Sequence, residues 1–354
     1  MYVSRRNFLG GLAAVGAGTL LRNHALQAQT GKPRIINVHH HLTGPAYAKF
    51  LTDNKARDFP NKSAAEGIEL MDQAGITMAF CSIIGPGIWF GDVDATRRLA
   101  RECNDYAAKL VSDYPGRFGI FTTLPLPDID GSLKEIEYGF DTLKADGVYM
   151  FTNWGGKALY GDKYLGDPAL APIYEELNRR NALVYTHPKD AACCHDILPG
   201  VNGATIEYPM DTTRTIMSLL SSGTAAKYPN VKFIFSHAGG ATTGVVGRMA
   251  GGSTTYLQDG GVLAPGAPPP PAAGDRLKIV QRFYYDTAGA TNPVTLGALR
   301  KMVPLSQILF GNDFPFGGAA EQHNLLVKAG VFNARELAAI DNENPSRLLP
   351  RARA

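Results

Sequence analysis

The sequence predicts a single (β/α)8 barrel of the TIM type, within the α/β class of folds. Short apolar runs and helical patterns alternate about eight times between residues 33 and 350, as expected for a parallel α/β protein. About 320 residues are available for these units, a length that suits one closed barrel. No glycine-rich phosphate loop follows any of the runs, which counts against an open nucleotide-binding sheet.

The first half of the chain supplies four strands and three helices. Apolar runs of strand length occupy residues 34–39, 76–83, 118–124 and 147–152. Apolar residues at helical spacing occupy residues 64–74, 95–114 and 132–144, between those runs. The strict alternation predicts parallel strands that are covered by the intervening helices.

The second half repeats the pattern. Further apolar runs occupy residues 183–187, 232–236, 283–287 and 308–311, and helical spacing marks residues 169–181 and 211–222. We expect Asp211 to be the N-cap of the second helix, because a carboxylate accepts hydrogen bonds from first-turn N–H groups. Residues 265–273 include four consecutive prolines, which predicts an extended surface loop, either a spacer or a cover for a site or a neighbouring subunit.

The first 28 residues resemble an export signal. Arg5 and Arg6 precede an apolar run at residues 8–21 that is too short to span a bilayer as a helix. The paired arginines are typical of a twin-arginine signal, which predicts a periplasmic or secreted protein. We therefore divide the chain into a signal peptide, residues 1–28, and a barrel domain, residues 33–350. The alternatives are a frayed basic terminus and an uncleaved anchor.

The net charge of +3 arises entirely within that signal. Residues 1–28 contain three arginines and no acid, so 32 basic and 32 acidic residues remain in the rest of the chain. A neutral body with no basic cluster argues against nucleic acid as a partner, and against stable membrane association after signal cleavage.

The four cysteines are too few for a disulfide scaffold, and we expect all of them to be free thiols. Cys193 and Cys194 are adjacent in the chain, and neighbouring cysteines pair poorly. The alternative for these two is a soft-metal or redox site.

Reactive side chains collect at the predicted strand ends, where barrels place their active sites. His39, His41, His187 and Asp313 all follow this rule. His39 and His41 share one side of their strand, so both can bind one ion, whereas His40 points to the other side. Three imidazoles and a carboxylate suit a single divalent metal, Zn²⁺ best, with Mn²⁺ or Fe²⁺ as alternatives.

Other residues are candidates for catalysis and substrate binding. His237 also ends a strand, and we expect it to act with Asp313 in proton transfer; the alternative is a fifth metal ligand. Arg214 can bind a carboxylate through its guanidinium fork, or can lie on a helix surface. Trp154 and Phe316 can form a stacking wall for the substrate, or can belong to the core.

These strand ends together resemble the amidohydrolase superfamily, in the branch that contains 2-amino-3-carboxymuconate-6-semialdehyde, 6-methylsalicylate and γ-resorcylate decarboxylases. Residues 160–167, 207–214 and 344–348 resemble the 6-methylsalicylate side of that branch. The resemblance implies a TIM barrel, a metal-dependent carboxy-lyase and a homodimer. Asn37 replaces a frequent aspartate, the fourth strand has no lysine for a second metal, and Gly240 replaces the glutamate of resorcylate-type enzymes.

Two reactions fit this ligand set. The resemblance implies non-oxidative decarboxylation of a small aromatic or unsaturated carboxylic acid, in which a metal holds the substrate and Asp313 or His237 protonates the carbon. Hydrolysis of a lactone, amide or ester by metal-activated water is the alternative. A non-catalytic metal-binding or sugar-binding barrel is a third reading.

Overall fold

The computed structural model describes residues 34–41, 43–55, 62–154, 163–194, 197–251 and 273–353. The predicted export signal, and nearly all of the proline-rich segment 265–273, lie outside these residues. Within the described part of the chain, no helix combines the length and the hydropathy that crossing a bilayer requires.

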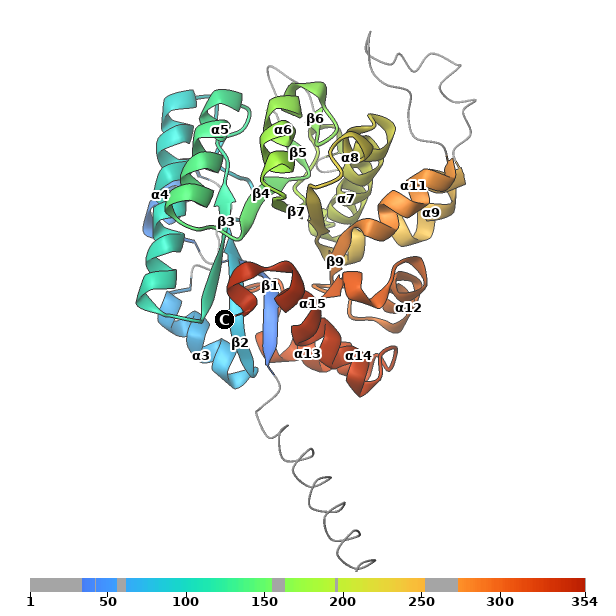
Figure 1. Cartoon of the computed structure of the whole chain (residues 1–354). Coiled ribbons are helices and arrows are strands. Elements are labelled where there is room, and N and C mark those ends of the chain that lie inside the picture. Colours follow the sequence, from blue (N-terminus) through green and yellow to red (C-terminus); the bar gives the residue numbers. More distant parts are fainter. Residues whose placement is uncertain are drawn as a thin grey trace, which may run out of the picture. The chain divides into compact units, whose positions relative to one another are not determined.

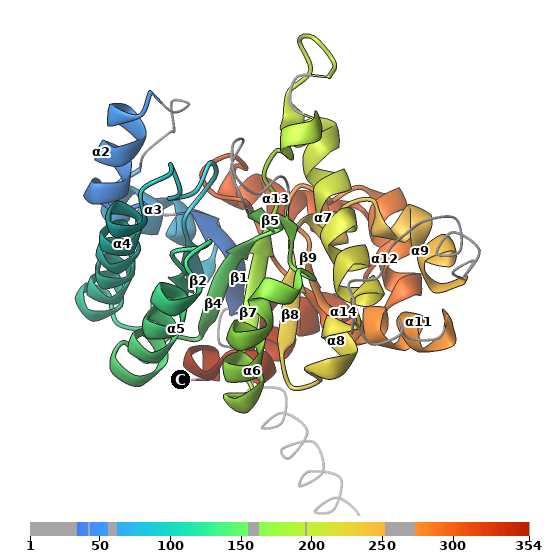
Figure 2. The same cartoon turned by 90° about the horizontal axis from the view of Figure 1, so that it is seen from above.

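Eight parallel strands form the centre of the molecule (Figure 2). They are hydrogen-bonded in the order β1 (Ile35–His41), β2 (Ile76–Ser82), β3 (Phe118–Thr123), β4 (Gly147–Phe151), β7 (Leu183–His187), β8 (Lys232–Phe235), β9 (Tyr284–Asp286) and β10 (Ile308–Leu309). Every pairing within this order is parallel. The predicted barrel is therefore confirmed.

Hydrogen bonds between the first strand and the chain around the last one close the barrel. Val38 N–H donates to Phe310 O at 3.0 Å, and His41 N–H donates to Phe314 O at 2.8 Å. A parallel bridge also joins His40 to Phe314. We call this junction the seam.

Helices surround the strands (Figures 1 and 2). They are α2 (Pro45–Asp53), α3 (Ala64–Gln73), α4 (Val93–Asp113), α5 (Ile129–Glu137), α6 (Ala171–Arg179), α7 (Gly203–Ser221), α8 (Thr224–Lys227), α9 (Thr242–Gly251), α11 (Ala273–Arg282), α12 (Pro293–Met302), α13 (Ala319–Lys328), α14 (Ala334–Ala338) and α15 (Asn344–Leu348). A short antiparallel pair, β5 (Asn153–Trp154) and β6 (Lys163–Tyr164), follows β4.

The core has two layers because successive side chains of a strand point to opposite faces. Leu183 and Tyr185 of β7 belong to a cluster inside the barrel, which also holds Val38 and Phe121. Val184, between them, belongs to the larger cluster that the strands share with the helices. Both faces of the strands are therefore buried, which explains why the sequence shows apolar runs instead of alternation.

Helix α7 differs from the prediction. It begins at Gly203, eight residues before Asp211, and its N-cap is Asn202, whose side chain accepts from Ala204 N–H at 3.0 Å. The helix continues through Pro209, a residue that usually ends the helical pattern. Asp211 is fully buried and accepts a hydrogen bond from the Tyr164 hydroxyl at 2.9 Å, so the predicted capping role for Asp211 is wrong.

Candidate active site

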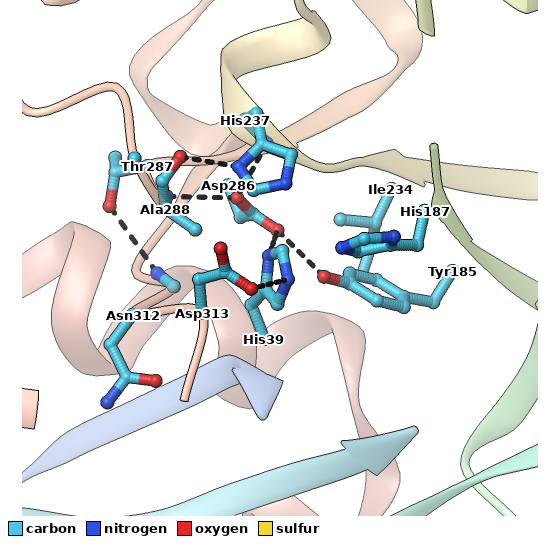
Figure 3. Close-up of polar contacts among 12 residues, drawn as sticks. His39, Tyr185, His187, Ile234, His237, Asp286, Thr287, Ala288, Asn312 and Asp313 are labelled. Atoms are coloured by element: carbon cyan, nitrogen blue, oxygen red, sulfur yellow. Dashed lines mark hydrogen bonds and ion pairs between the residues drawn. The ribbon is translucent and has the colours of Figure 1, made fainter. Parts of the chain in front are cut away.

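The structure brings the four predicted ligands together. His39 and His41 end β1, His187 ends β7, and Asp313 follows β10, and one ligand atom from each lies within 4.8 Å of all the others. Asp313 Oδ1 lies 3.1 Å from His39 Nε2 and 3.3 Å from His41 Nε2. His39, His187 and Asp313 face one another in Figure 3. We call these four residues the ligand cluster.

Strand geometry selects which of the three consecutive histidines join the cluster. His40 points away from it, as predicted, and stacks on Phe314 with ring centroids 4.2 Å apart. Asn37 Nδ2 lies 3.3 Å from His40 Nδ1 and donates to Asn312 Oδ1 at 2.8 Å. The Asn37 side chain therefore links His40 of β1 to Asn312, which follows β10, across the seam. Burial, with the neighbouring imidazoles, lowers the pKa of His40 to about 3, so this ring is neutral.

Each histidine of the ligand cluster is oriented by a bond at Nδ1. His39 Nδ1 lies 3.0 Å from Asp286 Oδ2, His41 Nδ1 lies 3.0 Å from Ile83 O, and His187 Nδ1 lies 2.7 Å from Pro188 O. An acceptor at Nδ1 favours the tautomer that carries its proton there. The Nε2 lone pairs are then left for the cluster, as metal-binding histidines require.

The electrostatics of the ligand cluster favour a cation. Burial lowers the pKa of His39, but Asp286 and Asp313 outweigh it and raise that pKa to about 10. Burial raises the pKa of Asp313, but His39 and His41 outweigh it and hold the pKa well below its usual range. Burial, reinforced by the neighbouring histidines, holds the pKa of His187 well below its usual value. Without a metal, His39 is therefore protonated at neutral pH, and the two carboxylates beside it stabilise that positive charge. A divalent ion would displace this proton and take its place beside the ionised Asp313, so the residues fit the ion.

Asp286, at the end of β9, is a site residue that the sequence reasoning missed. It is fully buried and accepts four hydrogen bonds, each 3.0 Å long, from the His39 ring, the Tyr185 hydroxyl, His237 N–H and Ala288 N–H (Figure 3). A carboxylate that holds a ligand histidine fixes its tautomer and its orientation. The rule that barrels place active-site residues at strand ends also applies to Asp286, because it falls near the end of the strand predicted at residues 283–287.

His237 lies beside the ligand cluster but is outside the group of four. Its ring centroid is 4.9 Å from that of His39 and 5.4 Å from that of His187. His237 Nδ1 lies 2.9 Å from Ala288 O, which leaves Nε2 for proton transfer. The backbone φ of His237 is 55° and that of Asp313 is 56°, a left-handed conformation that is uncommon for residues other than glycine and that often marks functional sites.

Gly240 explains one departure from the resorcylate-type pattern. Its φ of 63° and ψ of −130° suit glycine, and a Cβ at this position would lie 2.1 Å from Pro209 O. The backbone therefore has no room for a glutamate here.

A small pocket lies over the ends of β2, β3 and β4, and none of the four residues of the ligand cluster is part of its lining. Ile83, whose carbonyl binds His41, lines this pocket, and so does Phe151, which pairs in register with His187. Most of the lining is apolar or aromatic. It includes Trp89, Leu124, Tyr149, Met150, Trp154 and Lys189. We call it the aromatic pocket.

The three predicted substrate-binding residues lie in different surroundings. Trp154 lines the aromatic pocket and donates from Nε1 to Tyr164 O at 3.3 Å. Phe316 is 49% exposed, and its ring centroid lies 6.4 Å from that of His41. Arg214 Nη1 lies 3.7 Å from Glu207 Oε2, and no contact with the ligand cluster is seen within the described residues. Its role in binding a carboxylate stays a prediction.

The expectation of four free thiols is half right. Cys81 and Cys103 are free and buried, whereas Cys193 and Cys194 form a disulfide. The two bonded cysteines lie at the end of a 3-10 turn, Ala192–Cys194. The guanidinium of Arg214 contacts this turn, with Nη2 3.6 Å from Cys194 Sγ.

Comparisons with known proteins agree with this geometry. A family model described as amidohydrolase matches residues 36–351. A 6-methylsalicylic acid decarboxylase of Penicillium expansum is 35% identical over 289 residues, covering 79% of this chain and 84% of that protein. Another, from Aspergillus aculeatus, is 34% identical over 338 residues, covering 89% and 96%. The fold also matches a dihydroxybenzoic acid decarboxylase of Polaromonas sp. with bound manganese and an inhibitor, 2-nitroresorcinol, at a TM-score of 0.75 and 21% identity, over 90% of this chain and 98% of that one.

Proposed function

This chain belongs to the amidohydrolase family, and we propose that it is a metal-dependent, non-oxidative decarboxylase of a small aromatic carboxylic acid. The observation that carries the proposal is the ligand cluster, because a divalent metal held by its three imidazoles and one carboxylate can bind the carboxylate of a substrate. A substrate like 6-methylsalicylate, an ortho-hydroxybenzoate, is supported by the two fungal relatives. Gly240, where no glutamate fits, argues against a resorcylate-type substrate.

The ligand cluster is the proposed metal site, with His39, His41, His187 and Asp313 as ligands. When bound, a divalent ion supplies positive charge that holds the substrate oxygens and stabilises negative charge on the ring. Three nitrogen donors favour Zn²⁺, and the manganese of the Polaromonas structure makes Mn²⁺ the alternative.

The reaction needs one proton transfer. The bond between the ring carbon and the carboxylate breaks, CO2 leaves, and the ring carbon takes a proton. Two groups can carry it, His237 beside the ligand cluster and Asp313 within it. His237 Nδ1 is committed to Ala288 O, so Nε2 is the atom that would deliver the proton.

Mass spectrometry of reactions with hydroxybenzoates, muconate semialdehydes and lactones tests the proposal. Purified protein of measured metal content should convert an aromatic acid to a product lighter by the mass of CO2. Chelation should abolish this conversion, and added Zn²⁺ or Mn²⁺ should restore it. Gain of the mass of water on a lactone, with no acid losing CO2, would instead establish the hydrolase.

We also propose that the protein is exported by the twin-arginine route, which the Arg5-Arg6 pair and the neutral remainder of the chain support. Replacing both arginines by lysine should leave the protein in the cytoplasm, whereas the unaltered chain should be found outside it with a new N-terminus near residue 29. An unchanged distribution of the two forms would refute export by this route.

A further inference from the structure

The disulfide between Cys193 and Cys194 lies on the turn that follows β7, the strand that carries His187. Cys193 is exposed and Cys194 is half-buried. Thiol–disulfide exchange requires an external thiolate to reach one sulfur of the bond. Cys193 is the more accessible of the two for such an attack.

The disulfide can contribute little to the stability of the fold. A disulfide stabilises a protein mainly by closing a loop of the unfolded chain, and the effect grows with the length of that loop. Cys193 and Cys194 are one position apart, so the loop is the shortest possible. Exposed disulfides are also the ones that are reduced readily. Adjacency and exposure therefore suit a bond that opens and closes better than a structural cross-link.

The chain around the disulfide is held by contacts that do not involve sulfur. Lys189 O accepts a hydrogen bond from the Asn153 amide at 3.2 Å, and the Ala191 side chain is fully buried. Ala191 O accepts from Cys194 N–H at 3.0 Å, which completes the turn. We therefore expect the turn to persist when the bond between the sulfurs opens.

Arg214 of α7 places positive charge at one of the two sulfurs. Its Nη2 donates a hydrogen bond to Cys194 Sγ at 3.6 Å. Its Nη1 lies 3.7 Å from Glu207 Oε2 and 3.8 Å from Asp211 Oδ1, but is buried without a hydrogen-bond partner among the described residues. The guanidinium thus has a second donor to offer if the sulfur beside it becomes charged.

This contact makes the two cysteines unequal. A neighbouring arginine favours the thiolate form of a cysteine, and a thiol that ionises readily leaves faster in disulfide exchange. Cys194 is therefore the better leaving group, whereas Cys193 is the sulfur that a reductant can reach.

We propose that Cys193 and Cys194 form a reversible redox site, in which a dithiol reductant attacks Cys193 and Cys194 leaves as a thiolate paired with Arg214. A thiolate of the reductant bonds to Cys193 Sγ, the bond between the two cysteines breaks, and its electron pair goes to Cys194 Sγ. The second thiol of the reductant then displaces Cys193. The reductant gives up two electrons and becomes a disulfide; one of its protons goes to Cys193 and the other to solvent. An external disulfide reverses these steps.

The site of attack can be located by mass spectrometry of the folded, full-length chain. After treatment with reduced glutathione and an acid quench, fragmentation should place the mixed disulfide on Cys193. Dithiothreitol should add two hydrogens to the chain, and oxidised glutathione should remove them. Cys81 and Cys103 are internal controls that should stay unmodified, because both are buried and burial raises the pKa of their thiols.

Substitutions of Arg214 test the pairing with the leaving thiolate. Arg214→Gln should slow reduction by dithiothreitol by about 3- to 10-fold, because the thiolate loses its cation. Arg214→Lys should keep most of the rate, since it keeps the charge. The matched control is Arg347→Gln, which removes an exposed arginine paired with Glu343 and should leave the rate unchanged. Melting temperatures of all three variants identify any that fail to fold.

Several outcomes would overturn the proposal. They are a glutathione adduct mainly on Cys194 or equally on both cysteines, reduction that occurs only when the protein unfolds, and a folded Arg214→Gln variant that is reduced as fast as the unaltered chain. The glutathione measurement needs no variant, so it decides the site of attack even if Arg214→Gln does not fold. None of these measurements requires a metal or a substrate, so they are independent of the decarboxylase proposal.

Discussion

The carboxylate of Asp286 lies 3.0 Å from Nδ1 of His39, so a fully buried acid on β9 orients a ligand that comes from β1. The two residues are 247 positions apart in the chain. The contact gives His39 a fixed tautomer and adds negative charge behind it.

Asp286→Asn should therefore weaken metal binding by about 10- to 100-fold, because the amide keeps the shape but removes the charge. Competition with a chelator of known affinity measures the change. Asp275→Asn is the matched control, because Asp275 is an exposed acid that pairs with Lys278 on α11. Equal metal affinity in the two variants would refute an orienting role for Asp286.

Substitutions of His237 and Asp313 should have different effects on metal binding and activity. His237→Gln should lower kcat by about 100- to 10,000-fold while the protein keeps its metal, because His237 lies outside the ligand cluster. Asp313→Asn should lose both metal and activity. Metal analysis beside steady-state kinetics measures both effects. Loss of metal from His237→Gln would show that His237 is a ligand, and full activity in Asp313→Asn would remove Asp313 from the site.

Gly240→Ala should destabilise the protein by about 1–3 kcal/mol, because a Cβ would meet Pro209 O and the backbone would be strained. Gly244→Ala on α9 is the control, since nothing lies within 4 Å of the added carbon. Alanine suits a helix better than glycine, so that change should be neutral or stabilising. Urea unfolding at matched metal content measures both changes. Equal stability of the two variants would contradict the tight approach at Gly240.

Glu176 links stability to pH. The hydrogen bonds from Arg179 lower its pKa; burial opposes this, Arg180 adds to it, and the result is about 2. A folded-state pKa below the unfolded value of 4.5 stabilises the protein above that value, and the effect is lost as the pH falls toward 2. Glu176→Gln should cost about 1 kcal/mol at neutral pH, and the difference from the unaltered protein should shrink below about pH 5. Urea unfolding across that range measures this, and a difference independent of pH would contradict it.

The sequence could predict the barrel and the ligand cluster because both depend on local patterns. Successive side chains of a strand point to opposite faces, which separates His40 from His39 and His41. Barrels place active-site residues at strand ends, which identifies His187 and Asp313. The contact between Arg214 and Cys194 could not be predicted, since it depends on how α7 packs against the turn after β7.

Local signals were also misleading in two places. Pro209 is a residue that usually ends a helix, yet α7 continues through it. The helix buries Asp211, which accepts hydrogen bonds from Asn153 of β5 and Tyr164 of β6. Adjacent cysteines such as Cys193 and Cys194 usually pair poorly, yet these two form a disulfide. At Pro209 tertiary packing overrides what the residue type prefers on its own.

The seam has a consequence for biosynthesis. His39 and His41 leave the ribosome early, whereas Asp313 leaves it only when most of the chain has been made. A growing chain can thus offer a metal two histidines at first, then a third, and the carboxylate last. A product that stops before β10 lacks both the strand that closes the barrel and the fourth ligand. All four ligands can therefore bind the ion together only after residue 313 has been synthesised.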